Sequence, residues 1–263
     1  MNKTTEEKLA GSLTAETTEL LPFLPYLLQD FWALGSDPAA MAELIKKHLV
    51  ISKDTIILDL GCGKGAVSVA VAKKLKVKTK GFDLISEFIN YAEQKAKEFD
   101  VSDLCNFVVG DINKTAQTET GYDVVILGAV GDALGNPLET LNKLKQTVKA
   151  GGYILIDECY LKDGGKQESI EYKNYEYLTE KEWIKLFADS GLEIIETVLP
   201  SETESENMDS DSGMAAITKR ANELIKKHPD KKDMFEGYIR SQQSEYDDID
   251  NNLEGVIWML RKV

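Results

Sequence analysis

Short apolar runs alternate with amphipathic stretches along most of the chain from Thr55 onward. The apolar runs predict strands at Thr55–Leu60, Val77–Asp83, Asn106–Gly110, Asp123–Gly128, Tyr153–Asp157, Leu192–Val198 and Val256–Arg261. Helical spacing of apolar residues predicts helices at Ala66–Leu75, Ser86–Phe99, Leu138–Val148 and Thr179–Ser190. Strands that alternate with helices are typical of an α/β fold, in which a mostly parallel sheet carries helices on both faces.

Local signals indicate where several of these helices begin and end. Ser86 is a candidate N-cap, and Thr179 with Glu182 matches a capping box. The pair Gly151-Gly152 is expected to close the helix that precedes it, and Gly191 is expected to stop the next one.

Two segments fall outside the alternation. Residues 1–50 carry an apolar cluster punctuated by Pro22 and Pro25 and are expected to form an N-terminal helical cap. Residues 201–250 begin with an acidic, serine-rich stretch, SETESENMDSDSG, that predicts a flexible loop. Two helical patterns follow, at Met214–Lys227 and Asp230–Tyr246. Because so long a connection is unusual, this insertion is expected to be a lid or a dimer contact, and composition does not decide between them. The expected organisation is therefore a cap at 1–50, a core domain at 51–200, a helical insertion at 201–250 and a final strand within 251–263.

Composition narrows the class of protein. The hydrophobic fraction of 43% and the charged fraction of 29% are ordinary for a globular chain. No apolar run approaches the roughly 20 residues of a membrane helix, and the N-terminus lacks a secretory core, so we expect a cytoplasmic protein with no membrane partner. The net charge of −14 argues against nucleic acid as a partner.

Cysteine and histidine are too few for a conventional metal site. Cys62, Cys105 and Cys159 form an odd set without paired metal spacing, and we expect reduced, packed thiols. With only His48 and His228 available, a histidine-rich site is excluded, and no metal is predicted.

The most informative stretch is the glycine-rich turn after the first strand, Ile57–Gly65. It contains Gly61, Gly63 and Gly65, which permit positive φ and let the backbone approach a ligand closely. Two acids, Asp83 and Asp111, end the next two strands. A carboxylate in the first of these positions can accept from ribose hydroxyls, and one in the second from an exocyclic amino group. The alternative is that each acid only caps the following turn or helix.

The glycine spacing departs from two phosphate-binding patterns. The third glycine comes one residue early for the dinucleotide pattern, and Lys64 is not followed by the Ser or Thr of a Walker loop. Neither a pyrophosphate nor a triphosphate is the expected ligand.

The stretch Asp59-x-Gly61-x-Gly63-x-Gly65 resembles the first motif of class I S-adenosylmethionine-dependent methyltransferases. The later motifs of that family are resembled, in order, by Asp83, Gly110–Ile112, Tyr122–Val125 and Lys149–Gly152. The likeness covers about residues 52–198 and 255–261. It is specific for fold and cofactor and nearly silent on the acceptor.

The resemblance implies a seven-stranded sheet with its last strand antiparallel, and S-adenosylmethionine as cofactor. It implies that Asp59 and the glycine turn hold the methionyl part, Asp83 the ribose, Asp111 with Ile112 the adenine, and Gly128–Val130 the surroundings of the sulfonium. Cys62 occupies a variable motif position and is expected to pack rather than react. The implied cofactor-binding residues are Asp59, Gly61, Cys62, Gly63, Gly65, Asp83, Leu84, Gly110, Asp111, Ile112, Gly128, Ala129 and Val130.

The acceptor side carries weaker signals. The acids and phenol that follow the fourth and fifth strands, Asp132, Glu158 and Tyr160, are candidates to face the methyl group, with Asp157 beside them. Tyr26 and Trp32 are candidate walls of an acceptor pocket, although aromatic clusters more often pack a core. The residues Gly128–Gly131 disfavour the DNA-base branch of the family and a magnesium-dependent catechol-type branch.

The leading hypothesis is a methyltransferase acting on a small molecule. A protein or peptide methyltransferase, a non-catalytic cofactor-binding module and a polyamine synthase remain alternatives, and a homodimer is possible.

Overall fold

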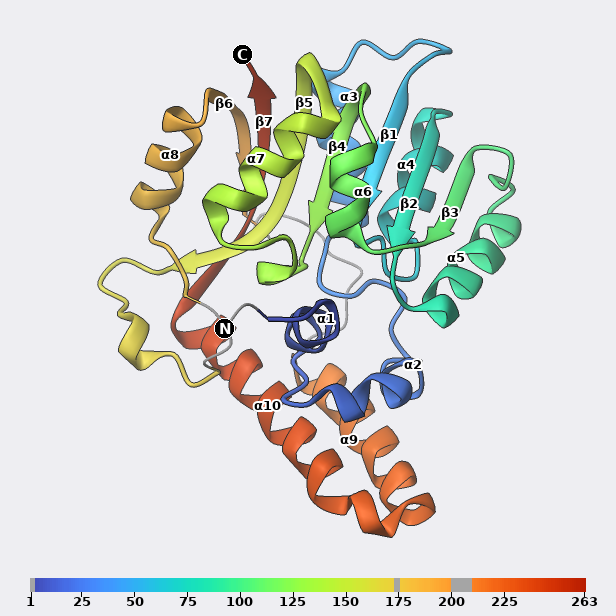
Figure 1. The fold of residues 1–263 in the computed structure, drawn as a ribbon, viewed down its shortest axis with the longest axis vertical. Helices are drawn as coiled ribbons and strands as arrows, with labels where there is room; N and C mark the ends of the chain where they lie inside the picture. The colour runs from blue at the N-terminus through green and yellow to red at the C-terminus, as the bar shows by residue number, and fades with distance from the viewer. Residues whose placement is uncertain (1–2, 173–175, 200–209) are drawn as a thin grey trace.

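The computed structural model describes residues 3–172, 176–199 and 210–263. A seven-stranded sheet forms its centre (Figure 1). The strands are β1 (Ile56–Leu60), β2 (Lys78–Asp83), β3 (Cys105–Val109), β4 (Tyr122–Gly128), β5 (Val148–Leu161), β6 (Leu192–Val198) and β7 (Leu253–Lys262). Their order is β3-β2-β1-β4-β5-β7-β6, and β7 runs antiparallel to both of its neighbours. The predicted mostly parallel sheet with an antiparallel last strand is confirmed.

Helices cover both faces of the sheet. The α-helices of the core are α3 (Pro38–His48), α4 (Ala66–Leu75), α5 (Ser86–Glu98), α6 (Ile112–Thr118), α7 (Pro137–Thr147) and α8 (Glu180–Asp189). Short 3-10 turns are η2 (Gly131–Leu134) and η3 (Gln167–Ser169). The period of two in a strand divides β4 between two cores. Val124 and Ile126 pack with α3 and α4, whereas Val125 and Leu127 pack with α7 and α8.

The N-terminal segment and the segment before β7 pack on each other at the carboxyl edge of the sheet (Figure 1). The first contains α1 (Thr5–Ser12), η1 (Thr18–Phe23) and α2 (Leu24–Leu27), and the second contains α9 (Ser210–Lys227), η5 (Pro229–Lys231) and α10 (Lys232–Asn251). Leu20, Leu24, Ile217 and Phe235 are fully or almost fully buried between them. Elements far apart in sequence thus form one helical layer beside the ends of the parallel strands.

Several predicted boundaries are wrong. Ser86 is the first residue of α5 and not its cap, because its hydroxyl donates to the Glu87 carboxylate while Ile85 stands at the N-cap without a side-chain bond. The helix expected to close at Gly151-Gly152 ends at Thr147, and β5 begins at Val148. Pairing with β7 extends β5 to Leu161, well beyond the predicted strand.

The acidic stretch at 201–213 is only partly visible. Its residues 201–209 lie outside the described residues, and residues 210–213 belong to α9 rather than to a loop. In the described part of the chain, every helix is too short or too polar to cross a bilayer.

Candidate active site

The glycine-rich turn joins β1 to α4 in the conformation that the sequence predicts. Gly61, Gly63 and Gly65 have φ of 76°, 51° and 76°, all in the left-handed region that favours glycine. The Gly61 and Cys62 amides donate to the Phe82 carbonyl, which ties the turn to the end of β2. A Cβ atom on Gly61 would stand 2.5 Å from Val130 Cγ1, so glycine is also needed for close packing against the segment after β4.

Asp83 lies at the end of β2 and fixes the glycine turn. One carboxylate oxygen accepts from the Gly63 amide at 3.0 Å and the other from the Ile85 amide at 2.9 Å. Burial raises the pKa of Asp83 to about 6. Because each carboxylate oxygen has two acceptor lone pairs, Asp83 can still accept from a ligand hydroxyl.

Asp59 stands behind the turn, where the Ser68 hydroxyl donates to it at 2.6 Å. Burial raises its pKa to about 6 as well. Asp59 and Cys62 line a small second space beside the turn, whereas Gly65 begins α4 at its N-cap. The Cys62 thiol is buried, and burial raises its pKa well above its ordinary value, so it is not a nucleophile at neutral pH.

Asp111 caps a helix and also faces the cleft, so its two predicted roles do not exclude each other. Its Oδ1 accepts from the Asn113 amide at 2.9 Å and caps α6, while its Oδ2 accepts from the Thr5 hydroxyl at 3.2 Å. It also lines the cleft at the carboxyl edge of the sheet, next to Gly110 and Ile112. Capping therefore does not remove this carboxylate from the site.

The structure gathers most of the predicted cofactor-binding residues around this one cleft. They are Gly61, Gly63, Asp83, Leu84, Gly110, Asp111, Ile112, Gly128, Ala129 and Val130. Helix α1 contributes lining residues that the sequence analysis missed, Thr5, Lys8, Leu9, Ser12 and Leu13, as do Leu34 and Phe88. The capping box of Thr4 and Glu7 was the available signal for α1. It locates a helix but not the surface on which the helix packs.

The turn after β4 is the most constrained part of the cleft. Ala129 has φ of 52°, a left-handed conformation that costs an L-residue about 1–2 kcal/mol. The Ala129 amide donates to the carbonyl of Asp157 on β5 at 3.1 Å. Burial, with the neighbouring Glu158 as a smaller cause, raises the pKa of the Asp157 carboxyl to about 8. Such strain at the end of a central strand marks a position that function constrains.

The acceptor-side candidates do not form one group. Asp132 and Glu158 line a common cavity, and Asp132 Oδ2 pairs with Lys3 Nζ at 2.9 Å. Tyr160 instead stacks on Trp258, with ring centroids 6.1 Å apart. Among the described residues, no group of three or more His, Cys, Asp or Glu side chains is placed to hold a metal ion.

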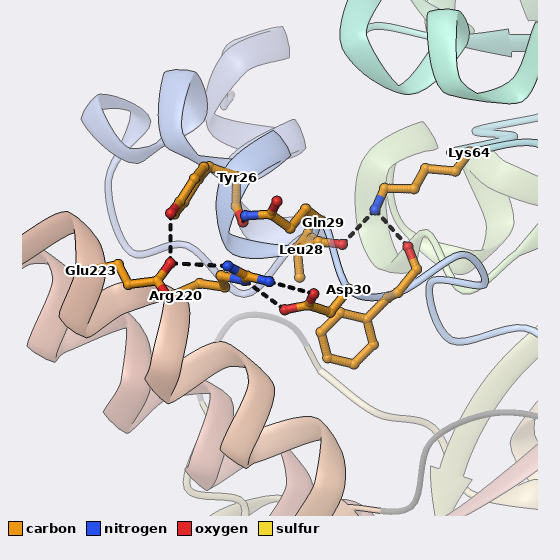
Figure 2. Close-up of polar contacts among 8 residues, drawn as sticks. Tyr26, Leu28, Gln29, Asp30, Lys64, Arg220 and Glu223 are labelled. Carbon is orange, nitrogen blue, oxygen red and sulfur yellow. Dashed lines mark hydrogen bonds and ion pairs between the residues drawn. The ribbon is translucent and has the colours of Figure 1, made fainter. Parts of the chain in front are cut away.

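Tyr26 and Trp32 take part in contacts that join the cap to its neighbours. The Tyr26 hydroxyl donates to Glu223 on α9 at 2.6 Å, and Figure 2 shows both side chains beside Arg220. Trp32 Nε1 donates to the Lys64 carbonyl at 3.0 Å, and its ring stacks on Phe99. Their predicted role as acceptor walls stays a prediction.

Lys64 of the glycine-rich turn reaches into the cap (Figure 2). Its ammonium donates to the carbonyls of Leu28 and Phe31. The residue is 3% exposed, and desolvation lowers its pKa to about 8. Lys64 therefore couples the position of the cap to the cofactor turn, a role that the motif alone did not indicate.

Fold and cleft together define a Rossmann-like domain with the motif set of class I methyltransferases. A family model described as "Methyltransferase domain" matches residues 51–234. The chain therefore belongs to this family, and the predicted class, a methyltransferase that depends on S-adenosylmethionine, is confirmed at the level of the family.

Two curated relatives show how widely acceptors vary. The chain is 30% identical over 131 residues to a ribosomal protein L11 methyltransferase of Nitratiruptor sp., covering 49% of this chain and 44% of that protein. It is 30% identical over 143 residues to a malonyl-[acyl-carrier protein] O-methyltransferase of Halalkalibacterium halodurans, covering 48% and 52%. The chain thus spans about half the length of these relatives.

A solved structure gives the likeness in fold. An S-adenosylmethionine-dependent methyltransferase from Thiobacillus denitrificans, crystallised with S-adenosyl-L-homocysteine, superposes with a TM-score of 0.73 at 19% identity. The match covers 92% of this chain and 98% of that one. The shared fold therefore includes the helical layer as well as the sheet.

Proposed function

We propose that this protein binds S-adenosylmethionine in the cleft beneath α1 and transfers its methyl group to a small-molecule acceptor. The observation that carries the proposal is the convergence of the glycine-rich turn, Asp83, Asp111 and the turn after β4 on that one cleft. Hydroxyl, amino and sulfonium groups of the cofactor match these carboxylates and backbone groups in chemistry.

Each of these groups has a definite part in the proposed complex. Gly61 and Gly63 admit the methionyl part, Asp83 accepts from the ribose hydroxyls, and Asp111 accepts from the adenine amino group. Leu84 and Ile112 offer apolar surface to the base. The cofactor supplies a methyl group already activated on sulfur, so the chain mainly aligns the acceptor and excludes water. Alignment alone is worth about 7–11 kcal/mol of barrier in favourable cases.

Helix α1 must shift when the cofactor enters. The free space in the cleft is about 70 Å³, room for a few water molecules but not for a nucleoside. The first residues of the chain are held there by two partly exposed polar contacts, Lys3 to Asp132 and Thr5 to Asp111, while Leu9 and Leu13 of α1 pack on a small apolar cluster that includes Phe88. We infer that α1 opens for entry and then covers the bound cofactor, which excludes water from the reaction.

A small acceptor is supported by the enclosed cavities at this edge and by the net charge of −14, which disfavours nucleic acid. The segment of α9 and α10 packs on the cap and is proposed to act as a lid or a dimer contact.

Calorimetry with S-adenosyl-L-homocysteine tests the cofactor site. Wild-type protein is expected to bind, and Asp83→Asn to bind at least tenfold more weakly, because hydrogen bonds to a charged group are worth about 1.5–3 kcal/mol. Asp103→Asn, an exposed carboxyl at the loop before β3, is the matched control and should bind normally. Absence of wild-type binding at high micromolar ligand would contradict the proposal.

The acceptor class requires a separate measurement. Labelled S-adenosylmethionine is incubated with a panel of small metabolites and, in parallel, with a peptide library. Transfer to small molecules alone is expected. Transfer confined to peptides would instead support the protein methyltransferase alternative.

A further inference from the structure

A cavity of about 370 Å³ is lined in part by residues of the turn after β4 that directly follow those lining the cofactor cleft. We call it the acid-lined cavity. It is lined by Lys3, Leu127, Gly131, Asp132, Gly135, Asn136, Pro137, Thr140, Ile156, Glu158, Cys159, Glu176, Tyr177, Leu178 and Trp183. Gly128, Ala129 and Val130 of the same turn line the cofactor cleft. Gly131 and Asp132, the next two residues of the chain, line the cavity, so the two spaces adjoin at this turn.

Negative charge dominates this cavity. Its lining carries three carboxyl groups, on Asp132, Glu158 and Glu176, against a single ammonium group, on Lys3. Burial, with a smaller repulsion from Asp132, raises the pKa of Glu158 to about 7. Carboxylates held together in a partly desolvated space are costly unless a cation joins them. A positively charged ligand would relieve this cost.

Two polar atoms of the lining residues lack partners. Trp183 is 5% exposed, and its Nε1–H donates to no acceptor among the described residues. Asp132 Oδ1 is buried and accepts from no described donor, although Oδ2 of the same carboxylate is paired with Lys3. Buried polar groups in folded proteins are nearly always paired. Both atoms are closed off from the cavity in this structure, so their side chains would have to turn before a bound molecule could complete their hydrogen bonding.

Much of the remaining lining is apolar, and the cavity is large enough for a small molecule. Leu127, Ile156, Leu178 and the Trp183 ring provide walls against which a hydrocarbon or aromatic body can pack. A volume of about 370 Å³ falls within the usual range for small-molecule sites of about 300–1,000 Å³. One part of the lining can thus contact an apolar group of a ligand, and the carboxyl groups can contact a cationic group.

We propose that the acid-lined cavity binds the methyl acceptor and that this acceptor is a small molecule joining an apolar body to a basic amine. The inference rests on the proposed function and names its substrate class. The amine pairs with Asp132 and Glu158, next to the turn that also lines the cofactor cleft.

Glu158 can also accept the proton that the bound amine must lose before methylation. An amine that enters as an ammonium ion must lose one N–H proton before its lone pair can form a bond to carbon. That proton passes to the Glu158 carboxylate, and a new N–C bond then forms as the C–S bond of the donor breaks. The electron pair of the broken bond remains on sulfur. The products are the methylated amine, the demethylated cofactor and one proton, which leaves Glu158 for solvent.

Binding measurements on the full chain, saturated with S-adenosyl-L-homocysteine, test the proposal independently of turnover. The probes share one phenyl body: 2-phenylethylamine, a panel of its N-alkyl relatives, neutral 2-phenylethanol and anionic 3-phenylpropanoate. The amines are expected to bind at least tenfold more tightly than the alcohol, and the acid most weakly. Trp183 fluorescence should change with amine binding and not with the acid.

Variants assign the binding to the carboxylates. Glu158→Gln and Asp132→Asn are each expected to weaken amine binding at least tenfold. Glu158→Gln should leave affinity for S-adenosyl-L-homocysteine within twofold, whereas Asp132→Asn also weakens the contact with Lys3 near the cofactor cleft and is read on amine binding alone. Asp189→Asn, an exposed carboxylate on α8, is the control and should change neither. If one variant unfolds, the other variant and the comparison of probes still decide.

Several outcomes would overturn the proposal. They are equal binding of amine and alcohol, unchanged amine binding in both variants, and no binding by any amine of the panel at millimolar concentration. Tighter binding of a lysine peptide that is acetylated only at its N-terminus, and so keeps its side-chain amine, than of any small amine would overturn the small-molecule assignment. Failure of the cofactor proposal is separately visible, because S-adenosyl-L-homocysteine would then not bind in the same samples.

Discussion

Gly61 and Gly121 both hold a positive φ, of 76° and 83°, but their surroundings differ. A Cβ on Gly61 would meet Val130 Cγ1 at 2.5 Å, whereas a Cβ on Gly121 would meet nothing within 4 Å. Alanine at either position has the same backbone strain, about 1–2 kcal/mol. Alanine substitutions at the two positions therefore distinguish the effect of backbone strain from the effect of a clash with the wall of the cofactor cleft.

We expect Gly121→Ala to lower the free energy of unfolding by about 1–2 kcal/mol and to leave binding of S-adenosyl-L-homocysteine unchanged. Gly61→Ala should lower stability further and weaken binding at least tenfold, because Val130 has to move into the cleft. Denaturant titration and calorimetry on both variants provide the measurements. Equal binding by the two variants would show that the close approach at Gly61 has no role in ligand affinity.

At the scale of single residues, the sequence predicted those positions that backbone geometry restricts. Positive φ at Gly61, Gly63 and Gly65 follows from residue type, and so does a carboxylate at the end of β2. Ala129 could not be predicted in the same way. Its left-handed φ is imposed by tertiary contacts, and an alanine in the sequence does not indicate such a conformation.

At the scale of elements, Lys64 ties the cap to the cofactor turn (Figure 2). On the other side of the same segment, Arg220 of α9 donates to both carboxylate oxygens of Asp30 at 2.7 Å. The residues between 26 and 32 are therefore held from the core by one cation and from α9 by another. Loss of either contact should increase the mobility of this whole segment.

We expect Lys64→Met to increase hydrogen exchange across residues 24–32 and to speed release of S-adenosyl-L-homocysteine. The substitution removes two hydrogen bonds from a charged donor, each worth about 1.5–3 kcal/mol in favourable cases, partly offset by relief of the buried charge. Hydrogen-exchange mass spectrometry and stopped-flow release measure the two effects. Lys53→Met, at an exposed loop position, is the control. Unchanged exchange across this segment in Lys64→Met would mean that the cap is positioned without Lys64.

The helices and strands could be predicted from the sequence where the pattern of apolar residues is strong. Apolar residues of β4 fill two cores, so that strand reads as a continuous apolar run, and its existence was clear. The ends of β5 and β7 were predicted too short. Their extensions, from Glu158 to Leu161 and from Leu253 to Gly255, depend on each other for pairing. The position of α1 over the cleft depends on contacts across more than 100 residues, such as Thr5 with Asp111, which local patterns do not encode.

At the scale of the whole molecule, the carboxyl edge of the sheet concentrates buried acids in a chain whose net charge is already −14. Burial raises the pKa of Asp59 and Asp83 to about 6, of Glu158 to about 7 and of Asp157 to about 8. Partly exposed acids with cationic partners, such as Asp30 beside Arg220, have a lowered pKa and change charge only in more acidic solution. Between about pH 5 and 8 these buried acids therefore make stability depend on pH. Near pH 8 the lowered pKa of Lys64, about 8, acts in the opposite direction and offsets part of their effect.

The sign of that dependence follows from proton binding. In the unfolded chain these carboxyls have pKa values of about 4, so the folded state binds more protons than the unfolded state at every pH in this window. The free energy of unfolding must then fall as pH rises, by up to about 1.4 kcal/mol for each unit of pKa shift. We expect the thermal midpoint to be highest near pH 5 and to fall by several degrees toward pH 8.

The variant Asp157→Asn tests which acid dominates the upper part of this window. An amide keeps the shape of the side chain but has no proton to lose, so the midpoint should fall less steeply between pH 7 and 8 than in wild type. Calorimetric scans at intervals of pH give both curves, and Asp189→Asn, exposed on α8, should follow wild type. A midpoint that rises from pH 5 to 8 would mean that these carboxyls are ionised at little cost. The cation inferred for the acid-lined cavity would then lack its physical basis.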